Sequence, residues 1–358
     1  MATLNTFTPW ALAVALTLGG ACGGAQAAYV DVLDLPAKAS ALVVHSALRD
    51  VALAGERLVA VGPRGHIVYS DNQGQDWHQA SVPVSADLNA LVFPTALEGW
   101  AVGNDGVILH SRDGGANWAV QLDGRQIGAL VAAHYQALAK AHPEDAQWAQ
   151  FVAEGQRLEQ EGADKPLLGV WFADARHGYA VGVFNLILRT DDGGSTWVPM
   201  QDRTDNPQGF HLNAIRAVGD ALYLVGEQGL LLKWDAGQQR FVALPSPYPG
   251  TWFGVFGKPG EVLAYGLRGH VARSLDGGQS WAKVDTGVTQ SITAASLDSH
   301  GDYWLFSQGG QVLRSRDGGL SFAVQPQVPP APVAGALQTG ANATVLVGER
   351  GVRVLPAR

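Results

Sequence analysis

The sequence GWAVGNDGVILHSRDGGANW, residues 99–118, contains two short apolar runs, a turn and a closing motif. The runs around Ala101–Val102 and Ile108–Leu109 are β-prone and too short for helices, so they predict two strands. Between them lies Asn104-Asp105-Gly106. Asparagine and glycine accept the positive φ of a tight two-residue turn. The stretch therefore predicts a β-hairpin.

The closing motif is the box Ser-x-Asp-x-Gly-x-x-Trp, formed by Ser111, Asp113, Gly115 and Trp118. The serine hydroxyl and the aspartate carboxylate can accept backbone N–H groups of the turn, while the glycine adopts a conformation that a Cβ would forbid. The tryptophan buries a large ring where the next strand begins. Serine and aspartate also occur in catalytic sites, but this pattern predicts a structural corner.

Variants of the unit recur at residues 58–77, 178–197, 222–241, 262–281 and 303–322, and a seventh copy starts at Thr344 and ends before any box. Successive box starts are 41 residues apart at Ser70 and Ser111, and again at Ser274 and Ser315. The copy at 222–241 keeps mainly Asp235 and Gly237 of its box. The other predicted structural box residues are Ser70, Asn72, Gly74, Trp77, Thr190, Asp192, Gly194, Trp197, Ser274, Asp276, Gly278, Trp281, Ser315, Asp317, Gly319 and Phe322.

Each copy follows another apolar run, such as residues 88–93, so each unit contains four predicted strands. Four-strand units of about 40 residues are typical of β-propeller blades. We therefore predict an all-β fold, a seven-bladed β-propeller spanning residues 28–358. Residues 29–35, YVDVLDL, are an orphan strand. We expect this strand to lie beside Val352–Leu355, complete blade 7 and remove a free edge from the ring.

Residues 125–165 interrupt the repeat between blades 2 and 3 with a predicted helical hairpin. Pro143 separates two segments of helical apolar spacing, with stripes at Ile127, Leu130, Val131, Tyr135 and Leu138, and at Trp148, Phe151, Val152 and Leu158. One interpretation is that the hairpin folds over its own blades and hides these stripes. The other is a partner-docking arm, because a connection this long is uncommon without a role. Tyr135, Trp148 and Phe151 are then candidate partner-binding residues.

Residues 1–27 are predicted to be a signal peptide. An apolar run from Trp10 to Leu18 is followed by Ala25-Gln26-Ala27, a cleavage pattern, although no lysine or arginine precedes the run. Lipid attachment at Cys22 is the minor alternative, since a lipobox requires leucine where Gly19 stands. Both interpretations predict an exported protein, located in the periplasm.

The composition argues against several kinds of partner and site. The net charge of −8 argues against a nucleic-acid partner. After cleavage no cysteine remains, so disulfides are excluded, and no further apolar stretch is long enough to cross a membrane. The histidines are scattered without metal-ligand spacing. We therefore predict no metal, no cofactor and no catalytic residue, and membrane association that is peripheral at most.

The repeats resemble the Asp-box, or BNR, repeat of sialidases and of many non-enzymatic propellers. They are most similar to the photosystem II stability and assembly factor family, whose unit G-x-A-V-G-x-x-G-x-I-L-x-S/T-x-D-G-G-x-x-W matches residues 99–118 and 178–197 nearly throughout. The resemblance implies a seven-bladed, non-catalytic, membrane-peripheral scaffold that helps to assemble integral membrane complexes. It also implies a possible partner of the resistance-nodulation-division (RND) transporter type, with which some exported relatives are associated. The 125–165 arm departs from the family pattern.

The predicted function is therefore an exported scaffold or accessory factor for a membrane protein complex. The alternative is a propeller that binds a glycan or small ligand in its central funnel, around Arg49, Asp50, Asn89, Asn213 and Trp252. A sialidase-like hydrolase is less favoured. Such a site needs three arginines from different blades, a Tyr–Glu pair and an acid. We find neither that family's R-I-P type opening nor a suitable Tyr–Glu pair.

One further group of residues bears on partner binding. The turns between the second and third strands of the blades should share one face of the ring with the 125–165 arm. Their tips carry Arg64, Arg268 and Arg350. One interpretation is that these tips are simply solvated. The other is an arginine-bearing face that engages a protein partner, since arginine is enriched at interface anchors.

Overall fold

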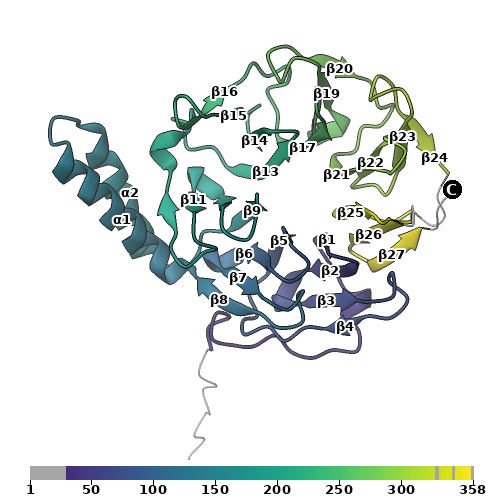
Figure 1. Ribbon diagram of the computed structural model, residues 1–358, viewed down its shortest axis with the longest axis horizontal. Helices are drawn as coiled ribbons and strands as arrows, with labels where there is room; N and C mark the ends of the chain where they lie inside the picture. The colour runs from purple at the N-terminus through teal and green to yellow at the C-terminus, as the bar shows by residue number, and fades with distance from the viewer. Residues whose placement is uncertain (1–29, 327–329, 341–342, 356–358) are drawn as a thin grey trace, which may run out of the picture. The chain divides into compact units, whose positions relative to one another are not determined.

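The computed structural model describes residues 30–326, 330–340 and 343–355, and the chain from Asp31 onward forms one compact unit. The predicted signal peptide lies outside the described residues. Within the unit, seven antiparallel sheets surround a central opening (Figure 1). The predicted seven-bladed β-propeller is confirmed.

The blades follow one another in chain order, and each pairs its strands in sequence from the centre outward. Blade 1 consists of β1 (Asp50–Ala54), β2 (Arg57–Val61), β3 (Ile67–Ser70) and β4 (His78–Gln79). Blade 2 consists of β5 (Leu88–Val92), β6 (Gly99–Gly103), β7 (Ile108–Ser111) and β8 (Ala119–Leu122). Blade 3 consists of β9 (Leu167–Phe172), β10 (Gly178–Gly182), β11 (Ile187–Thr190) and β12 (Val198–Pro199).

Blades 4 to 6 also have four strands, whereas blade 7 has three among the described residues. Blade 4 consists of β13 (Leu212–Val218), β14 (Ala221–Gly226), β15 (Leu231–Asp235) and β16 (Arg240–Ala243), and blade 5 of β17 (Trp252–Lys258), β18 (Glu261–Gly266), β19 (Val271–Ser274) and β20 (Ala282–Val284). Blade 6 consists of β21 (Ile292–Leu297), β22 (Tyr303–Ser307), β23 (Val312–Ser315) and β24 (Ala323–Gln325). Blade 7 consists of β25 (Gly335–Gln338), β26 (Thr344–Gly348) and β27 (Gly351–Leu355).

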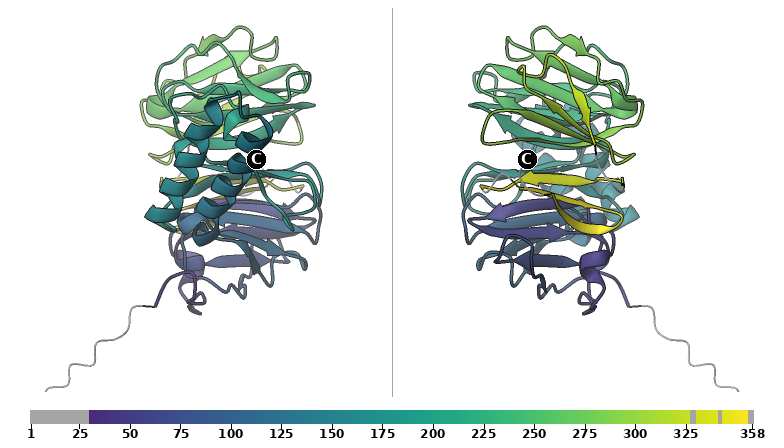
Figure 2. Two further views of the ribbon diagram at one scale, coloured as in Figure 1. Left: turned by 90° about the vertical axis from the view of Figure 1, so that its left-hand side faces the viewer. Right: turned by 90° about the vertical axis from the view of Figure 1, so that its right-hand side faces the viewer.

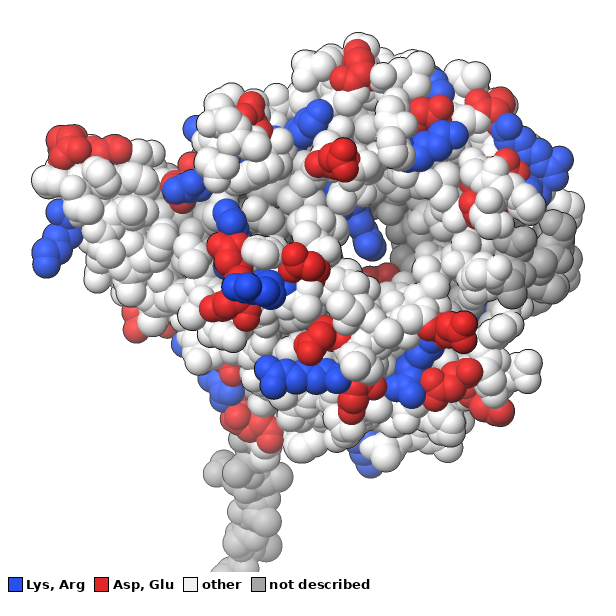
Figure 3. Space-filling view, viewed as in Figure 1, with Lys and Arg blue, Asp and Glu red and all other residues white. Residues whose placement is uncertain are grey.

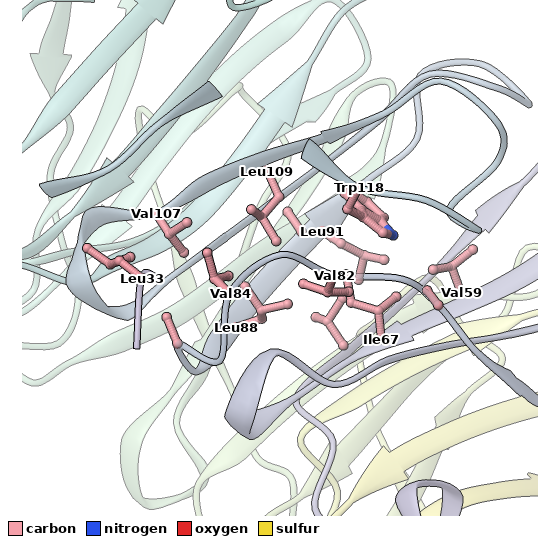
Figure 4. Packing of buried hydrophobic residues seen from close by; sticks show 14 of the residues in the cluster. Leu33, Val59, Ile67, Val82, Val84, Leu88, Leu91, Val107, Leu109 and Trp118 are labelled. Atoms are coloured by element: carbon pink, nitrogen blue, oxygen red, sulfur yellow. The ribbon is translucent and has the colours of Figure 1, made fainter. Parts of the chain in front are cut away.

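The core lies between adjacent blades. The second strand of a blade is covered on both faces, and all five residues of β6 and of β10 are buried. Figure 4 shows one such layer, in which Val59 and Ile67 of blade 1 lie near Leu91 and Leu109 of blade 2. Because every blade contributes to two layers, the hydrophobic burial that stabilises the ring is continuous around it.

The predicted Asp boxes form the expected closed corners. The Ser111 hydroxyl donates to Asp113 Oδ1 at 2.9 Å and accepts from the Gly115 N–H at 2.9 Å. The Asp113 carboxylate also accepts from the Asn117 N–H, at 3.0 Å, and Trp118 Nε1 donates to the Gly115 carbonyl at 2.9 Å. The side-chain polar groups of Ser111, Asp113 and Trp118 therefore all have partners inside the box. The corresponding hydroxyl-to-carboxylate or hydroxyl-to-amide bond is present in the boxes at Ser70, Thr190, Ser274 and Ser315.

Acid should destabilise the ring, because the box carboxylates have depressed pKa values. Hydrogen bonds from Ser321 and Ser315 lower the pKa of Asp317 to about 2, and bonds from Ser280 and Ser274 also lower the pKa of Asp276. A carboxylate with a lower pKa in the folded state stabilises the fold above its unfolded pKa and loses this contribution as the pH falls through the folded value. We expect the melting temperature to fall progressively between about pH 5 and pH 2.

Blade 1 suggests the control for this prediction. Asn72 occupies the aspartate position there and accepts both the Ser70 hydroxyl, at 2.9 Å, and the Asp76 N–H, at 2.9 Å. An amide can therefore form the box without titrating. The double variant Asp276→Asn and Asp317→Asn should lose less in melting temperature between pH 7 and pH 3 than the parent chain. Equal losses would mean that the acid sensitivity arises elsewhere.

The hairpin tips differ from the predicted two-residue turns. In blade 2 the tip is a single 3-10 turn, η3 (Asn104–Gly106), in which Asp105 has a φ of 57°. The same left-handed backbone occurs at Arg64, Phe184, Gln228 and Arg268, with φ between 52° and 61°. Only in blade 7 do two residues, Glu349 and Arg350, join a paired Gly348 and Gly351. The Asn-Asp-Gly pattern thus predicts the hairpin correctly but not the length of its turn.

The predicted closing strand at residues 29–35 is wrong. The described part of this segment, from Val30, is a turn, and blade 7 has no fourth strand among the described residues. Leu33 is buried in the layer between blades 1 and 2, Ser85 N–H donates to the Val32 carbonyl at 2.8 Å, and Asp34 pairs with Arg125 at 2.9 Å. The apolar run therefore finds its hydrophobic partners on blades 1 and 2 rather than at the edge of blade 7.

The ring is instead closed by the segment that precedes β1. Val43 and Leu48 are buried against Val345 and Val347 of β26, and the Leu48 N–H donates to the Gly348 carbonyl at 3.1 Å. The two ends of the propeller are thus joined by side-chain packing and by this backbone hydrogen bond.

The insertion between blades 2 and 3 is a helical hairpin that extends outward from the ring (Figures 1 and 2). Its helices are α1 (Gly124–Ala141), which starts at an Asp123 capping box, and α2 (Gln147–Glu161). Ile127, Val131 and Leu158 are buried, and this apolar stripe belongs to the same cluster as residues of blades 2 and 3. The interpretation that the hairpin packs on its own blades is therefore correct for this stripe.

Candidate partner-binding face

The hairpin tips and the helical arm lie on the same side of the ring. A Cβ placed on Gly106, at the tip of blade 2, would lie 2.8 Å from the Cα of Gly124, where α1 begins. On blade 3, the Arg157 guanidinium of α2 stands over the ring of Phe184, 6.0 Å from its centroid. The predicted sharing of one face by the tips and the arm is thus present in the structure.

Arg64, Arg268 and Arg350 are exposed on this face. No ion pair joins any of the three to an acidic group within the described part of the chain. The backbone beneath two of them is fixed, since Arg64 N–H donates to Asp87 Oδ1 at 2.9 Å and Arg268 N–H to Ser291 Oγ at 3.4 Å. Arg64 and Arg350 lie on the adjacent blades 1 and 7, and Arg268 lies two blades beyond, on blade 5.

Arg64 and Arg268 have a left-handed backbone conformation that L-residues rarely adopt. A non-glycine residue at such a φ costs about 1 kcal/mol or more, yet four tips besides that of blade 3 carry a non-glycine residue there. Asp105 is one of them, and burial, together with Asp31 and other nearby carboxylates, raises its pKa. The face therefore combines free cationic groups with an acid that is easier to protonate than usual.

Phe184, which is not among the predicted partner-binding residues, also lies on this face. Its side chain is 49% exposed at the tip of blade 3, where the blade 1, 2, 4 and 5 tips carry polar residues. With Phe151 of α2 it lines a hollow of about 690 Å³ between the arm and the ring. The signal was present in the sequence, because an aromatic residue replaces a polar one in an otherwise regular repeat position.

The predicted partner-binding residues of the arm are less accessible than expected. Tyr135 is fully buried, and its hydroxyl bonds to Asp202 Oδ1 at 2.8 Å. Burial, together with Asp202, raises the pKa of this phenol well above its usual value. Tyr135 is thus an anchor of α1 on blade 3, and its assignment to partner binding is wrong. Trp148 and Phe151 are partly buried, and both stack on Tyr135.

Most of the sequence matches the family described as photosynthesis system II assembly factor YCF48, over residues 32–144 and 149–256. The chain belongs to this family. The two matched ranges meet at the turn between α1 and α2, so both helices of the arm fall largely inside the match.

Named Ycf48 proteins are similar to the chain over different lengths. The photosystem II assembly lipoprotein Ycf48 of Synechococcus sp. (strain CC9902) is 31% identical over 140 residues, which cover 38% of this chain and 42% of that protein. The photosystem II assembly protein Ycf48 of Synechococcus sp. (strain JA-2-3B'a(2-13)) is 27% identical over 280 residues, covering 69% of this chain and 78% of that protein. These relatives are named as assembly factors.

Solved Ycf48 structures share the fold. A structure described as YCF48 bound to D1 peptide has a TM-score of 0.65 and 16% identity, and covers 88% of this chain and 94% of its own. YCF48 from Cyanidioschyzon merolae has a TM-score of 0.63 and 17% identity, with coverage of 90% and 98%. At these identities the similarity establishes the propeller and nothing about the partner.

The central opening of this Ycf48-family ring holds a cavity of about 160 Å³. Arg49, Asp50, Asn89 and Asn213 line it as predicted, and Figure 3 shows basic and acidic side chains at its wall. Burial raises the pKa of Asp50, which Arg216 opposes. Trp252 does not line the opening, because its ring is fully buried between blades. Its inclusion among the funnel residues is therefore wrong.

Polar side chains at the second position of three inner strands bridge neighbouring blades. Asn89 Nδ2 donates to the Leu167 carbonyl and Asn213 Nδ2 to the Trp252 carbonyl, both at 2.9 Å, and the Thr293 hydroxyl donates to the Val333 carbonyl at 2.5 Å. Arg49 donates to Asn89 and pairs with Asp87. These groups already have partners within the ring, so they stabilise the arrangement of the blades and do not favour the ligand-binding alternative.

Two further properties concern the described residues only. No group of three or more histidine, cysteine, aspartate or glutamate side chains is placed there to hold a metal ion. None of the helices there is both long and apolar enough to span a membrane.

Proposed function

We propose that the chain is an exported, non-catalytic scaffold that binds an integral membrane protein during assembly of its complex, through the face that carries Arg64, Arg268 and Arg350. One observation carries the proposal: a protein of net charge −8 keeps three exposed arginines of one face free of ion pairs in its described residues. Arginine at such positions can pair with a carboxylate or stack on an aromatic ring of a partner.

Membership of the Ycf48 family supports this function, because the named relatives are photosystem II assembly proteins and a related structure contains a D1 peptide. The N-terminal pattern supports export to the periplasm, by cleavage after Ala27 or, as the minor alternative, by lipid attachment at Cys22. For a bacterium without photosynthesis, the first candidate partner is a transporter of the RND type.

The test is affinity capture of the tagged protein with its partner from detergent-solubilised membranes of the source organism. The triple variant Arg64→Glu, Arg268→Glu and Arg350→Glu should lose most of the captured membrane protein, because the charge of three interface anchors is reversed. Its melting temperature should stay within a few degrees of the parent, since the three side chains are exposed and unpaired. Capture by the parent protein should also weaken as salt rises.

A matched control reverses three exposed positive charges elsewhere: Arg112→Glu, Arg176→Glu and Lys283→Glu. This variant has the same net charge and should capture the partner as the parent does. If both triple variants lose the partner equally, overall charge rather than this face is responsible. If the parent captures no membrane protein, the scaffold proposal itself fails.

A further inference from the structure

Among the described residues, the outer edge of blade 7 is open. Its sheet contains β25, β26 and β27, whereas each of the other six sheets has a fourth strand outside the third. In the right-hand view of Figure 2, β27 lies on the outer surface of the ring. An unpaired edge of this kind is a template for another strand, and proteins usually cover or shorten such edges.

The pairing of β27 shows which backbone groups point outward. Gly348 pairs with Gly351 across a two-residue turn, and Leu346 pairs with Arg353. In an antiparallel ladder this alternation directs the N–H and C=O groups of Val352 and Val354 away from β26. In blades 1 and 3 the equivalent carbonyls accept from the residue that follows the outer strand: Ile67 from Ala80 at 2.9 Å and Ile187 from Met200 at 3.0 Å. No such backbone donor reaches Val352 within the described residues.

The N-terminal segment approaches this edge but does not cover it. A Cβ on Gly351, in blade 7, would lie 1.8 Å from the carbonyl oxygen of Val44. In blade 1, a Cβ on Gly65 would lie 2.1 Å from the carbonyl oxygen of Val84. Val44 therefore occupies the same position relative to blade 7 as Val84 does relative to blade 1. Upstream of Val44 the two blades differ. Ala37 N–H donates to the Val82 carbonyl at 3.0 Å, and Ser40 N–H to Gln79 Oε1 at 2.9 Å. The residues that could have formed the fourth strand are thus bonded to blade 1.

The side chains of β27 also differ from those of the other third strands. The residue that pairs with the middle of the second strand is apolar and buried in the six other blades, namely Val68, Leu109, Leu188, Leu232, Ala272 and Leu313. In blade 7 it is Arg353, which is only half-buried. Burial and the nearby Arg350 lower the pKa of Arg353. Beside it, Val354 is 38% exposed. The edge therefore carries an arginine, whose Nη2 donates to the Ala331 carbonyl at 3.2 Å, next to a partly exposed apolar residue.

We propose that β27 is a docking edge for an extended segment of a partner protein, which adds to blade 7 as its antiparallel fourth strand. The segment has a small residue opposite Val354, an aspartate or glutamate opposite Arg353 and an apolar residue opposite Val352. The outer strand of blade 5 is the template, since Ala282, Lys283 and Val284 face Arg273, Ala272 and Val271 in that order. An acidic residue replaces lysine because blade 7 presents an arginine at the middle position.

A second copy of this chain is a poorer occupant of the edge. Antiparallel pairing of two β27 strands centred on Arg353 would place the two arginines directly opposite each other, and like charges in that position destabilise a sheet. The inference rests on the proposed partner-binding function and adds a second site to it, on the rim of the ring rather than on its face.

The first test uses the full chain and a synthetic peptide that copies residues 279–286 with Lys283→Glu, that is QSWAEVDT. In the free protein the Val352 and Val354 amides should exchange at least tenfold faster than those of Arg353 and Leu355, which pair with β26. Saturating peptide should slow exchange at Val352 and Val354. The matched peptide QSWAKVDT should bind at least tenfold more weakly, because its lysine faces Arg353.

Three results would overturn the proposal. Protection of Val352 and Val354 in the free protein would show that the chain covers its own edge, and protection that rises with protein concentration would show a second copy. Peptide binding without protection at these two amides would place the peptide elsewhere.

The second test separates this inference from the proposed function. Val354→Pro removes an outward N–H that is not used within the sheet, so the fold should tolerate it while strand addition is blocked. Val354→Thr keeps the N–H and is the control. In the membrane capture experiment Val354→Pro should reduce the captured protein at least fivefold and Val354→Thr should not. If the proline variant captures normally while the arginine triple variant does not, the docking edge is refuted and the scaffold function stands.

Discussion

Gly351→Ala should be among the most destabilising single substitutions in the chain, because it acts where the ring closes. Gly351 has a φ of 75°, and a Cβ there would lie 1.8 Å from the Val44 carbonyl oxygen, closer than atoms can approach. Two costs add: about 1 kcal/mol for the left-handed backbone and about 1–3 kcal/mol for the displacement of a packed neighbour. We expect the free energy of unfolding in urea to fall by roughly 3 kcal/mol.

The same substitution should loosen one specific contact. Displacement of Val44 pulls on the segment that buries Val43 and Leu48 against β26. Amide exchange at Leu48, whose N–H donates to the Gly348 carbonyl, should therefore accelerate more than exchange in β14 or β18, on the far side of the ring.

Gly287→Ala is the matched control, since Gly287 has a φ of 68° and no heavy atom of the described residues lies within 4 Å of the added Cβ. It bears the backbone cost alone and should lose about 1 kcal/mol. Equal losses for the two variants would show that the contact between Val44 and Gly351 contributes nothing to closure.

The closure of the ring also shows where inference from the sequence ends. The Asp boxes and blades could be predicted because a box is local: Ser111, Asp113 and Gly115 bond to one another within five residues, and the 41-residue spacing repeats that corner. The choice of closing segment is not local. Residues 29–35 and 43–48 are both apolar, and only the packing of Leu33 between blades 1 and 2 decides that the second segment meets β26.

The residues of the candidate site likewise include some that local sequence patterns predict and some that depend on long-range packing. Exposed tip arginines follow directly from the hairpin pattern, because a turn tip projects from the ring whatever surrounds it. The packing of the arm cannot be derived from the sequence in this way. Helical periodicity places Tyr135 on an apolar face but does not indicate which part of the protein covers that face. The structure covers it with blade 3, where Asp202 accepts its hydroxyl. Phe184 occupies a tip equivalent to those of the arginines, so its exposure also follows from the hairpin pattern. Apolar spacing alone does not distinguish it from the strand residues on either side.

Trp100→Ala should produce a loss of similar or greater size in the layer between blades 2 and 3. The Trp100 ring is fully buried and stacks on Phe172 of blade 3, with centroids 3.8 Å apart. Its Nε1 donates to Gln121 Oε1 at 2.9 Å, and Gln121 Nε2 donates to the Gly193 carbonyl of the blade 3 box at 2.8 Å. One side chain thus links both blades through packing and through a hydrogen-bond chain. Truncation should cost about 3–5 kcal/mol, measured by urea unfolding.

Trp100→Phe separates the two contributions, because it keeps an aromatic ring on Phe172 and removes the donor to Gln121. The unsatisfied Gln121 oxygen should cost about 1–3 kcal/mol, less than the cavity left by alanine. Trp148→Ala is the control for loss of an indole as such, since Trp148 is partly exposed on the arm and its Nε1 has no hydrogen-bond partner among the described residues. Trp148→Ala should lower the free energy of unfolding less than either Trp100 variant does. If Trp148→Ala proved as costly as Trp100→Ala, the arm would be an integral part of the core and not an addition packed onto it.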